Sequence, residues 1–441
     1  MQDKIYTAGI YTLGCKVNQY ESEAIAERLR EYGITIAKPS SVCDIYIINT
    51  CTVTAESDRK ACQFIRRAIQ KNPAAYVLVT GCLAQTDAER ISAISGVDYI
   101  SGNTDKLSVA DYAIKLIKAG KKNGTPKIAV RDINASGFEK MSITEFGRTR
   151  AYVKIEDGCE SKCAYCIIPS ARGKIRSKEP ADVLSEVRAL VRGGCREVVL
   201  TGIETASYGK DLGGIDLADL LVSVDCIEGL ERMRLGSLDP ALITKKFVEK
   251  IAPLSTIAPH FHLSLQSGSS KVLAAMKRKY NADMAMRAID LIREYIPNAQ
   301  FTTDVIVGFP GETDEDFEET MRFAKAARFL MIHVFPYSKR RGTIAAQMKD
   351  QVAPDIKRDR AARLSALAAE IRAEILSEQI GKSYPVLFET YKDGVAYGHT
   401  ANFIEIAVQA ERALTDMILN VKIVSAGNDA CVGVIDMRKE S

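Results

Sequence analysis

The chain has 441 residues, of which 46% are hydrophobic, so it can fill the cores of about three domains of roughly 150 residues each. Its 60 basic and 56 acidic side chains leave a net charge of +4, which is too small to indicate a nucleic-acid partner by itself. Eleven cysteines, an odd number, and an N-terminus without a basic-then-apolar leader favour reduced thiols in the cytoplasm, and the apolar runs are too short for a membrane span of ~20 residues.

The first part of the chain alternates between strand-like and helix-like segments. The strand-like segments are 4–13, 43–50 and 75–81, and the helix-like segments are 21–33, 57–70 and 86–94. Alternation of this kind is typical of an α/β domain with an open, mostly parallel sheet, because each helix carries the chain back to the start of the next strand. We therefore predict such a domain over residues 1–120.

Three cysteines of this domain, Cys15, Cys51 and Cys82, each follow directly on a predicted strand. The carboxyl ends of parallel strands share one edge of the sheet, so we expect these three side chains to meet there. Cysteine is also a common small buried residue, which is the better interpretation of Cys43 and Cys62. For three cysteines at equivalent positions, we predict an iron–sulfur cluster.

Residues 121–147 lack clear periodicity and are predicted to be a linker. From 148 to 350, strand and helix signals alternate at least six times. This pattern predicts parallel strands closed, or partly closed, into a (β/α) barrel whose chemistry lies at the carboxyl ends of the strands.

A C-x3-C-x2-C triplet, Cys159, Cys163 and Cys166, follows the first strand of this predicted barrel. Three thiolates on one short loop can each bind one iron of a 4Fe-4S cluster, so that the fourth iron is open to a small molecule. A zinc knuckle would need a fourth Cys or His nearby, and the first 259 residues contain no His. A chance group of cysteines is the other alternative.

The C-terminal part begins with a predicted connecting helix over 351–381, which starts with Pro and ends at Gly381. Residues 382–441 contain about five short strands separated by Gly, Asp and Asn turns, which predicts a small antiparallel β-barrel. Such barrels often bind oligonucleotides, although this segment has six basic against eight acidic residues and cannot be a simple basic clamp. RNA contacts of this barrel would depend on aromatic side chains such as Tyr391, Tyr397 and Phe403, or these side chains belong to its core.

Motifs along the whole chain resemble those of the radical S-adenosylmethionine (SAM) methylthiotransferases. In order, they are TLGCKVNQYE, NTCTVTAESD, GCLAQ, DGCESKCAYCIIPSARGKIRS, TGIETASYG, LSLQSGSSKVLAAMKRKY, VGFPGETDEDF and FPYSKRRGTIA. The resemblance implies an N-terminal methylthiotransferase domain, a central radical SAM domain and a C-terminal barrel called TRAM. Within this family, TLGCKVNQYE is most similar to the branch that modifies threonylcarbamoyladenosine beside the anticodon of tRNA.

The resemblance also implies a reaction, in which a methylthio group replaces hydrogen on carbon 2 of the adenine ring. An aromatic C–H of this kind resists both bases and nucleophiles, so radical chemistry is needed. The cluster on the triplet would pass an electron to SAM and cleave it to methionine and a deoxyadenosyl radical. The cluster on the other three cysteines would hold the inserted sulfur, which a second SAM methylates. The implied partners are the anticodon stem-loop of tRNA and an electron donor such as flavodoxin or ferredoxin.

Further residues at the strand ends are candidates for SAM contacts by the same resemblance. They are Tyr165, Gly202, Glu204, Ser237, Gln266, Val307 and Gly308. Polar residues also occur at strand ends without binding anything, and an exposed glutamate is common.

Three basic runs follow predicted strands near the mouth of the barrel. They are Arg172, Lys174, Arg176 and Lys178, then Lys277, Arg278 and Lys279, then Lys339, Arg340 and Arg341. We expect them to contact RNA phosphates, although a single charge run is more often a solvated face. His260 and His262 point to the same face of one strand, which suits packing or substrate contact better than a metal site.

Other functions remain open at this stage. The same chemistry could act on isopentenyladenosine in tRNA or on an aspartate of a ribosomal protein. A non-catalytic RNA-binding protein would require a fourth protein ligand to close each cluster, and a radical SAM enzyme of unrelated substrate would not need Cys15, Cys51 and Cys82.

Overall fold

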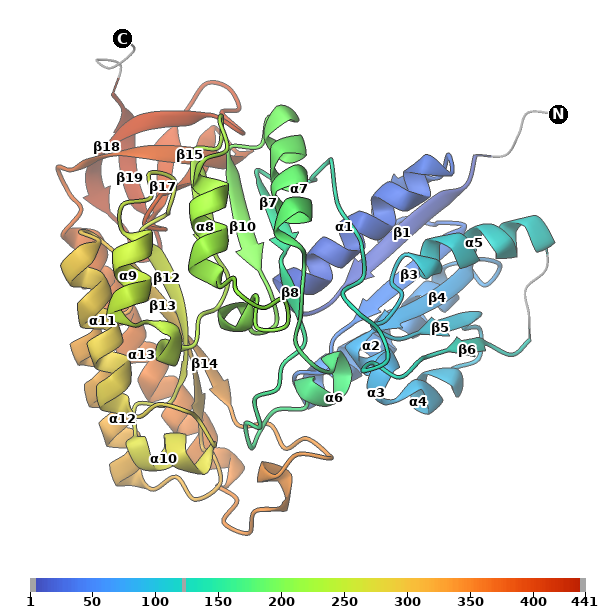
Figure 1. Cartoon of the computed structure of the whole chain (residues 1–441), viewed down its shortest axis with the longest axis horizontal. Coiled ribbons are helices and arrows are strands. Elements are labelled where there is room, and N and C mark those ends of the chain that lie inside the picture. Colours follow the sequence, from blue (N-terminus) through green and yellow to red (C-terminus); the bar gives the residue numbers. More distant parts are fainter. Residues whose placement is uncertain (1–4, 121–123, 437–441) are drawn as a thin grey trace.

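The computed structural model describes residues 5–120 and 124–436. Figure 1 shows an N-terminal α/β part, a central part of parallel strands with helices outside, and a small C-terminal barrel. The predicted α/β fold class, with these three parts in this order, is confirmed. None of the helices in the described residues is long and apolar enough to cross a membrane.

The N-terminal sheet has six parallel strands in the order β2-β1-β3-β4-β5-β6. The strands are β1 (Thr7–Thr12), β2 (Thr35–Ala37), β3 (Ile45–Thr50), β4 (Tyr76–Gly81), β5 (Tyr99–Ser101) and β6 (Lys127–Ala129). The helices are α1 (Lys16–Glu31), α2 (Ala55–Lys71), α3 (Cys82–Thr86), α4 (Ala88–Ser92) and α5 (Ser108–Ala119). Separate hydrophobic clusters cover the two faces of the sheet, as expected when helices pack on both sides. Strand β6 falls within the range predicted as a linker, because three residues at a sheet edge are too short to show a periodic pattern.

The central part consists of six parallel strands that form an incompletely closed barrel. Strands β7 (Arg150–Lys154), β10 (Glu197–Thr201) and β11 (Arg232–Leu235) form one sheet, and β12 (His260–Gln266), β13 (Gln300–Val307) and β14 (Met331–Pro336) form the other. Parallel bridges from Met233 to Ile257 and from Leu238 to Leu263 join the two sheets. Within the described residues, the outer strands β7 and β14 do not pair with each other, so the barrel is open on that side.

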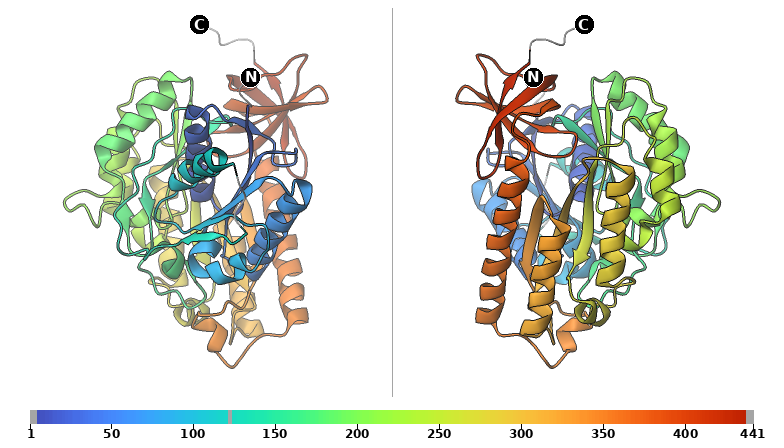
Figure 2. Two further views of the ribbon diagram at one scale, coloured as in Figure 1. Left: turned by 90° about the vertical axis from the view of Figure 1, so that its right-hand side faces the viewer. Right: turned by 90° about the vertical axis from the view of Figure 1, so that its left-hand side faces the viewer.

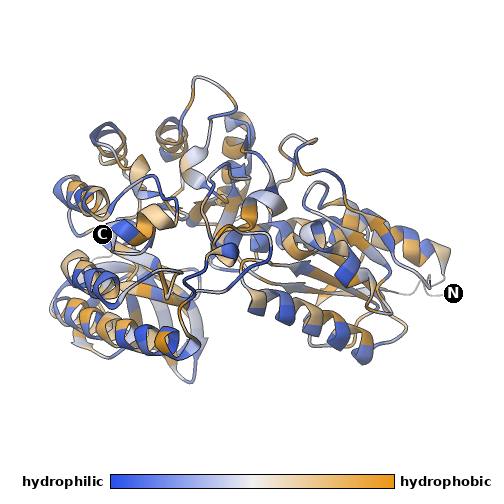
Figure 3. Ribbon diagram, turned by 90° about the horizontal axis from the view of Figure 1, so that it is seen from below, coloured by the Kyte–Doolittle hydropathy of each residue, from blue (hydrophilic) through white to orange (hydrophobic). Residues whose placement is uncertain are grey.

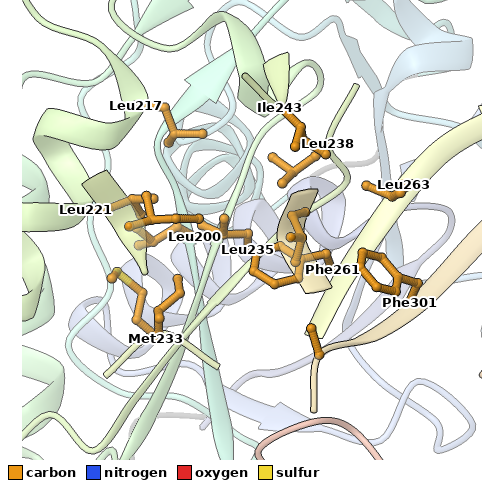
Figure 4. Packing of buried hydrophobic residues seen from close by; sticks show 14 of the residues in the cluster. Leu200, Leu217, Leu221, Met233, Leu235, Leu238, Ile243, Phe261, Leu263 and Phe301 are labelled. Atoms are coloured by element: carbon orange, nitrogen blue, oxygen red, sulfur yellow. The ribbon is translucent and has the colours of Figure 1, made fainter. Parts of the chain in front are cut away.

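Helices cover the outside of these strands and bury the main hydrophobic core. They are α7 (Pro180–Arg192), α8 (Leu217–Asp225), α9 (Lys245–Ile251), α11 (Ala282–Tyr295) and α12 (Asp314–Ala327). Figure 3 shows hydrophobic and hydrophilic stripes along the helices, as in amphipathic helices that pack on a sheet. In Figure 4, Leu200, Leu235 and Phe261 from three successive strands pack with Leu217 and Leu221 of α8 nearby.

Short elements shape the loops at the carboxyl ends of the strands. They are the hairpin of β8 (Glu156–Asp157) and β9 (Arg176–Ser177), the helices α6 (Ile168–Arg172) and α10 (Ser270–Ala275), and the 3-10 turns η1 (Thr205–Ser207), η2 (Pro240–Leu242) and η3 (Ala345–Gln347).

Helix α13 (Pro354–Ser377) leads to a closed five-stranded barrel in the order β15-β16-β17-β19-β18. The strands are β15 (Ser383–Lys392), β16 (Val395–Thr400), β17 (Glu405–Gln409), β18 (Ile418–Ala426) and β19 (Cys431–Ile435). We predicted an antiparallel barrel, but β17 and β19 pair in parallel. Strand β18 lies between them in the sequence and pairs with β19 in the antiparallel direction. Figure 2 shows this barrel at one end of the molecule, with α13 running from it along the central part.

The C-terminal barrel docks against the amino ends of the central strands, away from the cysteine loops. Arg232 donates a hydrogen bond of 2.7 Å to the carbonyl oxygen of Pro385, and Arg150 pairs with Glu389. Phe403 stacks on His260 with ring centroids 4.4 Å apart. This aromatic side chain therefore serves the contact between the two parts and is not displayed for RNA, whereas Tyr391 is exposed.

Candidate active site

The cysteine triplet lies on a loop between β8 and α6, at the carboxyl end of the first central strand. The loop needs glycine at position 158, where φ is +95° and an added Cβ would lie 1.9 Å from the carbonyl oxygen of Lys174. The Cys159 backbone N–H donates to the Gly173 carbonyl at 2.9 Å and fixes the start of the loop against its end.

Each sulfur of the triplet accepts a hydrogen bond. The donors are the backbone N–H of Ser161 to Cys159 at 3.4 Å, the backbone N–H of Ile168 to Cys166 at 3.4 Å, and the Arg278 guanidinium to Cys163 at 3.2 Å. Such donors stabilise negative charge on sulfur and tune an iron–sulfur cluster when one is bound. Burial raises the pKa of the free Cys166 thiol to about 11, so the site favours thiolates only once a cation or cluster is bound.

Arg278 is held between the triplet, the loop after β11 and strand β12. Its guanidinium donates 2.9 Å and 3.1 Å hydrogen bonds to the Asp239 carboxylate and the Ser264 carbonyl, and its Nε donates to the Tyr280 hydroxyl at 3.0 Å. Although it was predicted as one of a run of RNA-binding cations, its position beside Cys163 assigns it to the site.

Glu204 lies directly beside the triplet. Its carboxylate accepts hydrogen bonds from Cys159 Sγ at 3.2 Å and from the Ser161 hydroxyl at 2.8 Å. Burial and this carboxylate together raise the pKa of the Cys159 thiol. The loop of Glu204 is therefore close enough to meet a molecule bound beside the triplet, as the sequence predicts for SAM.

The other predicted SAM contacts line the ends of the same strands. An added Cβ on Gly202 would lie 2.5 Å from Glu156, whose buried carboxyl accepts from the Glu204 backbone at 2.8 Å and has a raised pKa owing to burial. Ser237 is exposed, and Gln266 adopts φ of +69° at the end of β12. Tyr165 packs with the buried Phe309 beside the loop.

Val307 ends β13, and Gly308 follows it. An added Cβ on Gly308 would lie 2.4 Å from Cγ of Lys357 in α13, and φ is +70°. The glycine therefore allows α13 to pack closely, while Val307 is fully buried.

Cys15, Cys51 and Cys82 come together at the carboxyl edge of the N-terminal sheet. Cys15 precedes α1, Cys51 follows β3, and Cys82 begins α3. An added Cβ on Gly14 would lie 2.7 Å from Cys51 Sγ, and each cysteine has an electrostatic interaction with the other two.

These three thiols lie in a crowded environment. Burial, with a further contribution from Cys82, raises the pKa of Cys51 to about 12. Surrounding chain also raises the pKa of Cys15, although its side chain keeps exposed surface, so that one side remains reachable from solvent. Asn103 donates to Cys82 Sγ at 3.5 Å.

Arg172 connects the two cysteine groups. It belongs to α6, which follows the triplet and lies beside α3 in Figure 1. Its Nε donates to Cys82 Sγ at 3.3 Å, and its other nitrogens donate to Glu21 at 2.5 Å and Asn18 at 2.5 Å.

Arg172 belongs to a fully buried ion network that spans both domains. Lys106 pairs with Glu21 at 3.0 Å, and Lys154 pairs with Glu21 at 2.8 Å and with Asp157 at 2.6 Å. Burial alone would raise the pKa of Glu21, but Arg172, Lys106 and Lys154 hold it well below its ordinary value. Arg176 also lies 3.7 Å from Asp157, so four cations face two carboxylates and the network carries a net positive charge next to Cys82.

Sequence reasoning missed this network, because it treated Arg172, Arg176 and Lys178 as a surface run. All three are buried: Lys178 pairs with Glu186, and Arg176 donates to the Arg172 carbonyl at 2.7 Å. The one signal was the strand-like alternation of cations with Gly173, Ile175 and Ser177 in ARGKIRSK, because one face of a strand is often buried. The cations that remain exposed are Lys174, Lys277, Lys279, Lys339 and Arg341.

The donor sets fit two iron–sulfur clusters. In the part of the chain that the structure describes, no three His, Cys, Asp or Glu side chains converge to hold a single metal ion. In a 4Fe-4S cluster, by contrast, each cysteine binds a different iron. Each of the two sets offers three sulfurs with hydrogen-bond donors around them.

Comparisons with known proteins agree with this arrangement. Residues 153–324 match the model of the radical SAM superfamily, and residues 7–102 match uncharacterized protein family UPF0004. A radical SAM methyltransferase structure, TsrM from Kitasatospora setae, shares the fold with a TM-score of 0.55 and 15% identity, covering 83% of this chain and 89% of that one.

Curated relatives match over nearly the whole chain. Threonylcarbamoyladenosine tRNA methylthiotransferase MtaB of Bacillus subtilis (strain 168) is 39% identical, covering 96% of this chain and 94% of that protein. The protein of the same name from Thermotoga maritima is 37% identical over 90% of each chain. A tRNA-2-methylthio-N(6)-dimethylallyladenosine synthase of Pelotomaculum thermopropionicum is 34% identical over 97% of each. The chain belongs to the radical SAM methylthiotransferase family and is most similar to its MtaB type, so it is an enzyme that uses SAM and a 4Fe-4S cluster.

Proposed function

We propose that this enzyme adds a methylthio group to carbon 2 of threonylcarbamoyladenosine beside the anticodon of tRNA. The observation that carries the proposal is the pair of cysteine groups, Cys159, Cys163 and Cys166 on one side and Cys15, Cys51 and Cys82 on the other, joined by Arg172. A substrate held between them can lose hydrogen to one site and receive sulfur from the other.

The names of the relatives support this substrate. Relatives called threonylcarbamoyladenosine tRNA methylthiotransferases reach 39% identity, whereas the dimethylallyladenosine synthase reaches 34%. The difference is modest, so the substrate requires a direct test.

The two cysteine groups would each hold a 4Fe-4S cluster, and these clusters with two SAM molecules would supply the electron, the hydrogen acceptor, the sulfur and the methyl group. Glu204, Ser237 and Gln266 would bind and orient SAM beside the triplet, together with Tyr165, Gly202 and Val307. Gly308 would act through the packing of α13. Arg278 and Arg172 would place N–H donors on the cluster sulfurs.

The anticodon stem-loop would bind across the cysteine loops. The exposed cations Lys174, Lys277, Lys279, Lys339 and Arg341 would neutralise its phosphates. We retain the predicted division into 148–350, the connecting helix over 351–381 and 382–441, and we extend the N-terminal part, predicted as 1–120, to include β6. We also propose a cytoplasmic location, with flavodoxin or ferredoxin as electron donor.

Mass spectrometry of nucleosides from total tRNA, with and without this gene, tests the proposal. Loss of only the methylthio form of threonylcarbamoyladenosine is the expected result. Loss of the methylthio form of isopentenyladenosine would show that the enzyme belongs to the sister branch of the family. Unchanged tRNA would overturn the proposal and direct attention to an aspartate of a ribosomal protein.

A further inference from the structure

Lys16 is a cation next to the N-terminal cysteine group, and it has no ion-pair partner within residues 5–120 and 124–436. It follows Cys15 and is the first residue of α1, which lies between the N-terminal sheet and β7 in Figure 1. Its electrostatic neighbours come from three different strands of the central part, namely Arg150, Arg234 and Asp304. Among the described residues, none forms a hydrogen bond or an ion pair with its amine. Its side chain is only partly exposed.

The arginines near Lys16 are already neutralised in part. Arg150 and Arg234 both pair with Glu197, at 3.1 Å and 2.9 Å, and Arg150 also pairs with Glu389. Arg232 joins Glu197 at 3.7 Å. Three arginines therefore share two carboxylates, and this group has no negative charge to spare for Lys16.

The opposite wall of this region is polar and reaches solvent. His262 Nε2 lies 3.3 Å from the carboxylate of Asp304, which is 31% exposed, and His333 on the outer strand β14 is exposed. Burial lowers the pKa of both His260 and His333, which keeps these rings uncharged near neutral pH. Four cations, Lys16 and the three arginines, thus face three carboxylates, Glu197, Glu389 and Asp304.

A buried or half-buried amine without a counterion is unfavourable, and a ligand that brings a carboxylate would correct this. The proposed substrate brings one. Carbon 2 and the N6 substituent of adenine lie on the same edge of the ring, so a long side chain next to the sulfur-holding cysteines is within reach of the N6 substituent.

We propose that Lys16 binds the carboxylate of the N6 substituent and thereby selects an adenosine with an acidic side chain over one with an apolar side chain. This inference rests on the proposed function, because it names the group by which that substrate is recognised. An isopentenyl group, which has no charge, would leave the Lys16 amine unpaired in the complex.

A backbone phosphate is the alternative anion for Lys16. The partial burial of the side chain and its position next to Cys15 favour a group near the reacting base, because phosphates stay on the outside of a stem-loop. A phosphate contact would weaken binding of every RNA to a similar extent, whereas a carboxylate contact would affect only the acidic nucleoside.

The test measures the affinity of the cluster-loaded enzyme for four anticodon stem-loops that differ at one adenosine. That adenosine carries the threonylcarbamoyl group, the same group with its carboxyl as a methyl ester, an isopentenyl group, or no substituent. The ester removes the charge and keeps the shape. We expect the wild-type enzyme to bind the acid about tenfold more tightly than the ester, as for a charge-assisted hydrogen bond.

Two variants complete the experiment. Lys16→Gln should bind acid and ester about equally while retaining its affinity for the unmodified RNA, as expected when one contact is removed. Lys115→Gln, on the exposed face of α5, should retain the tenfold preference as the matched control. Iron content and circular dichroism establish that each variant is folded and loaded.

Each outcome has a separate meaning. If the wild-type enzyme binds the acid and the ester RNA equally, the proposed role of Lys16 is overturned. The proposed function still stands in that case if the acid RNA is methylthiolated. If Lys16→Gln binds all four RNAs more weakly to the same extent, Lys16 contacts a phosphate, and its role in binding the carboxylate is also overturned. Methylthiolation of the isopentenyl RNA and not of the acid RNA would instead refute the proposed function.

Discussion

The Nε of Arg172 donates a hydrogen bond of 3.3 Å to Sγ of Cys82, although the two residues belong to different domains and lie 90 positions apart. Through the same guanidinium, Glu21 and Asn18 of α1 are joined to the loop of the triplet. One fully buried side chain thus fixes the position of both cysteine groups relative to each other.

We predict that Arg172→Lys changes the electronic properties of the N-terminal cluster. Lysine retains the charge but loses the fork that reaches Cys82, Glu21 and Asn18 together. Loss of a hydrogen bond to sulfur should make the reduction potential more negative. A redox titration followed by EPR, in protein whose triplet is replaced by alanine, measures this cluster alone. An unchanged potential at unchanged iron content would contradict the role of Arg172.

Glu21→Gln should destabilise the protein and change its response to acid. It removes the carboxylate that pairs with Arg172, Lys106 and Lys154 and leaves Asp157 as the one carboxylate for these cations and Arg176, at a cost of about 3–5 kcal/mol in the free energy of unfolding. Because the pKa of folded Glu21 lies well below its ordinary value of 4.5, its contribution is complete above that value and is lost as pH falls through the folded pKa.

The measurement for Glu21→Gln is urea unfolding at neutral pH and at about pH 3, values chosen on either side of the ordinary glutamate pKa of 4.5. The difference between wild type and variant should shrink at the lower pH. Glu370→Gln, on the exposed face of α13, is the control and should resemble wild type at both. A gap that stays constant with pH would show that Glu21 does not titrate as the network requires.

Gly158→Ala should prevent the triplet from holding its cluster. The new methyl group would lie 1.9 Å from the Lys174 carbonyl oxygen, so the loop must move. Gly194→Ala is a matched control, since φ there is +93° and nothing lies within 4 Å of the added Cβ. After reconstitution, iron per chain should fall by about half in Gly158→Ala only. Full iron in both variants would mean that the loop tolerates the displacement.

Phe403→Ala should loosen the C-terminal barrel. The ring stacks on His260 and His399, with centroids 4.4 Å and 4.7 Å away, and lies 4.9 Å below the Arg234 guanidinium. Its removal should cost about 1–3 kcal/mol, since the site is only partly buried. Limited proteolysis should then cleave faster between α13 and β15. Tyr391→Ala is the control, because this ring is exposed. The protease should cleave this variant at the wild-type rate.

The cysteine groups could be predicted from the sequence because the information is local. The spacing of Cys159, Cys163 and Cys166 limits them to one loop, and parallel strands bring residues such as Cys15 and Cys51 to one edge. The periodicity of strands and helices likewise predicted the three parts of the fold.

The tertiary structure alone decided which charges are paired. Arg172 and Lys174 look equivalent in ARGKIRSK, yet the first is buried against Glu21 and Cys82 and the second is exposed. Lys16 has no ion-pair partner among the described residues, and two of its neighbours, Arg150 and Arg234, are cations that distant strands place beside it. Spacing along the chain fixes which residues lie on one loop, but the partner of a long charged side chain depends on every element that reaches it in space.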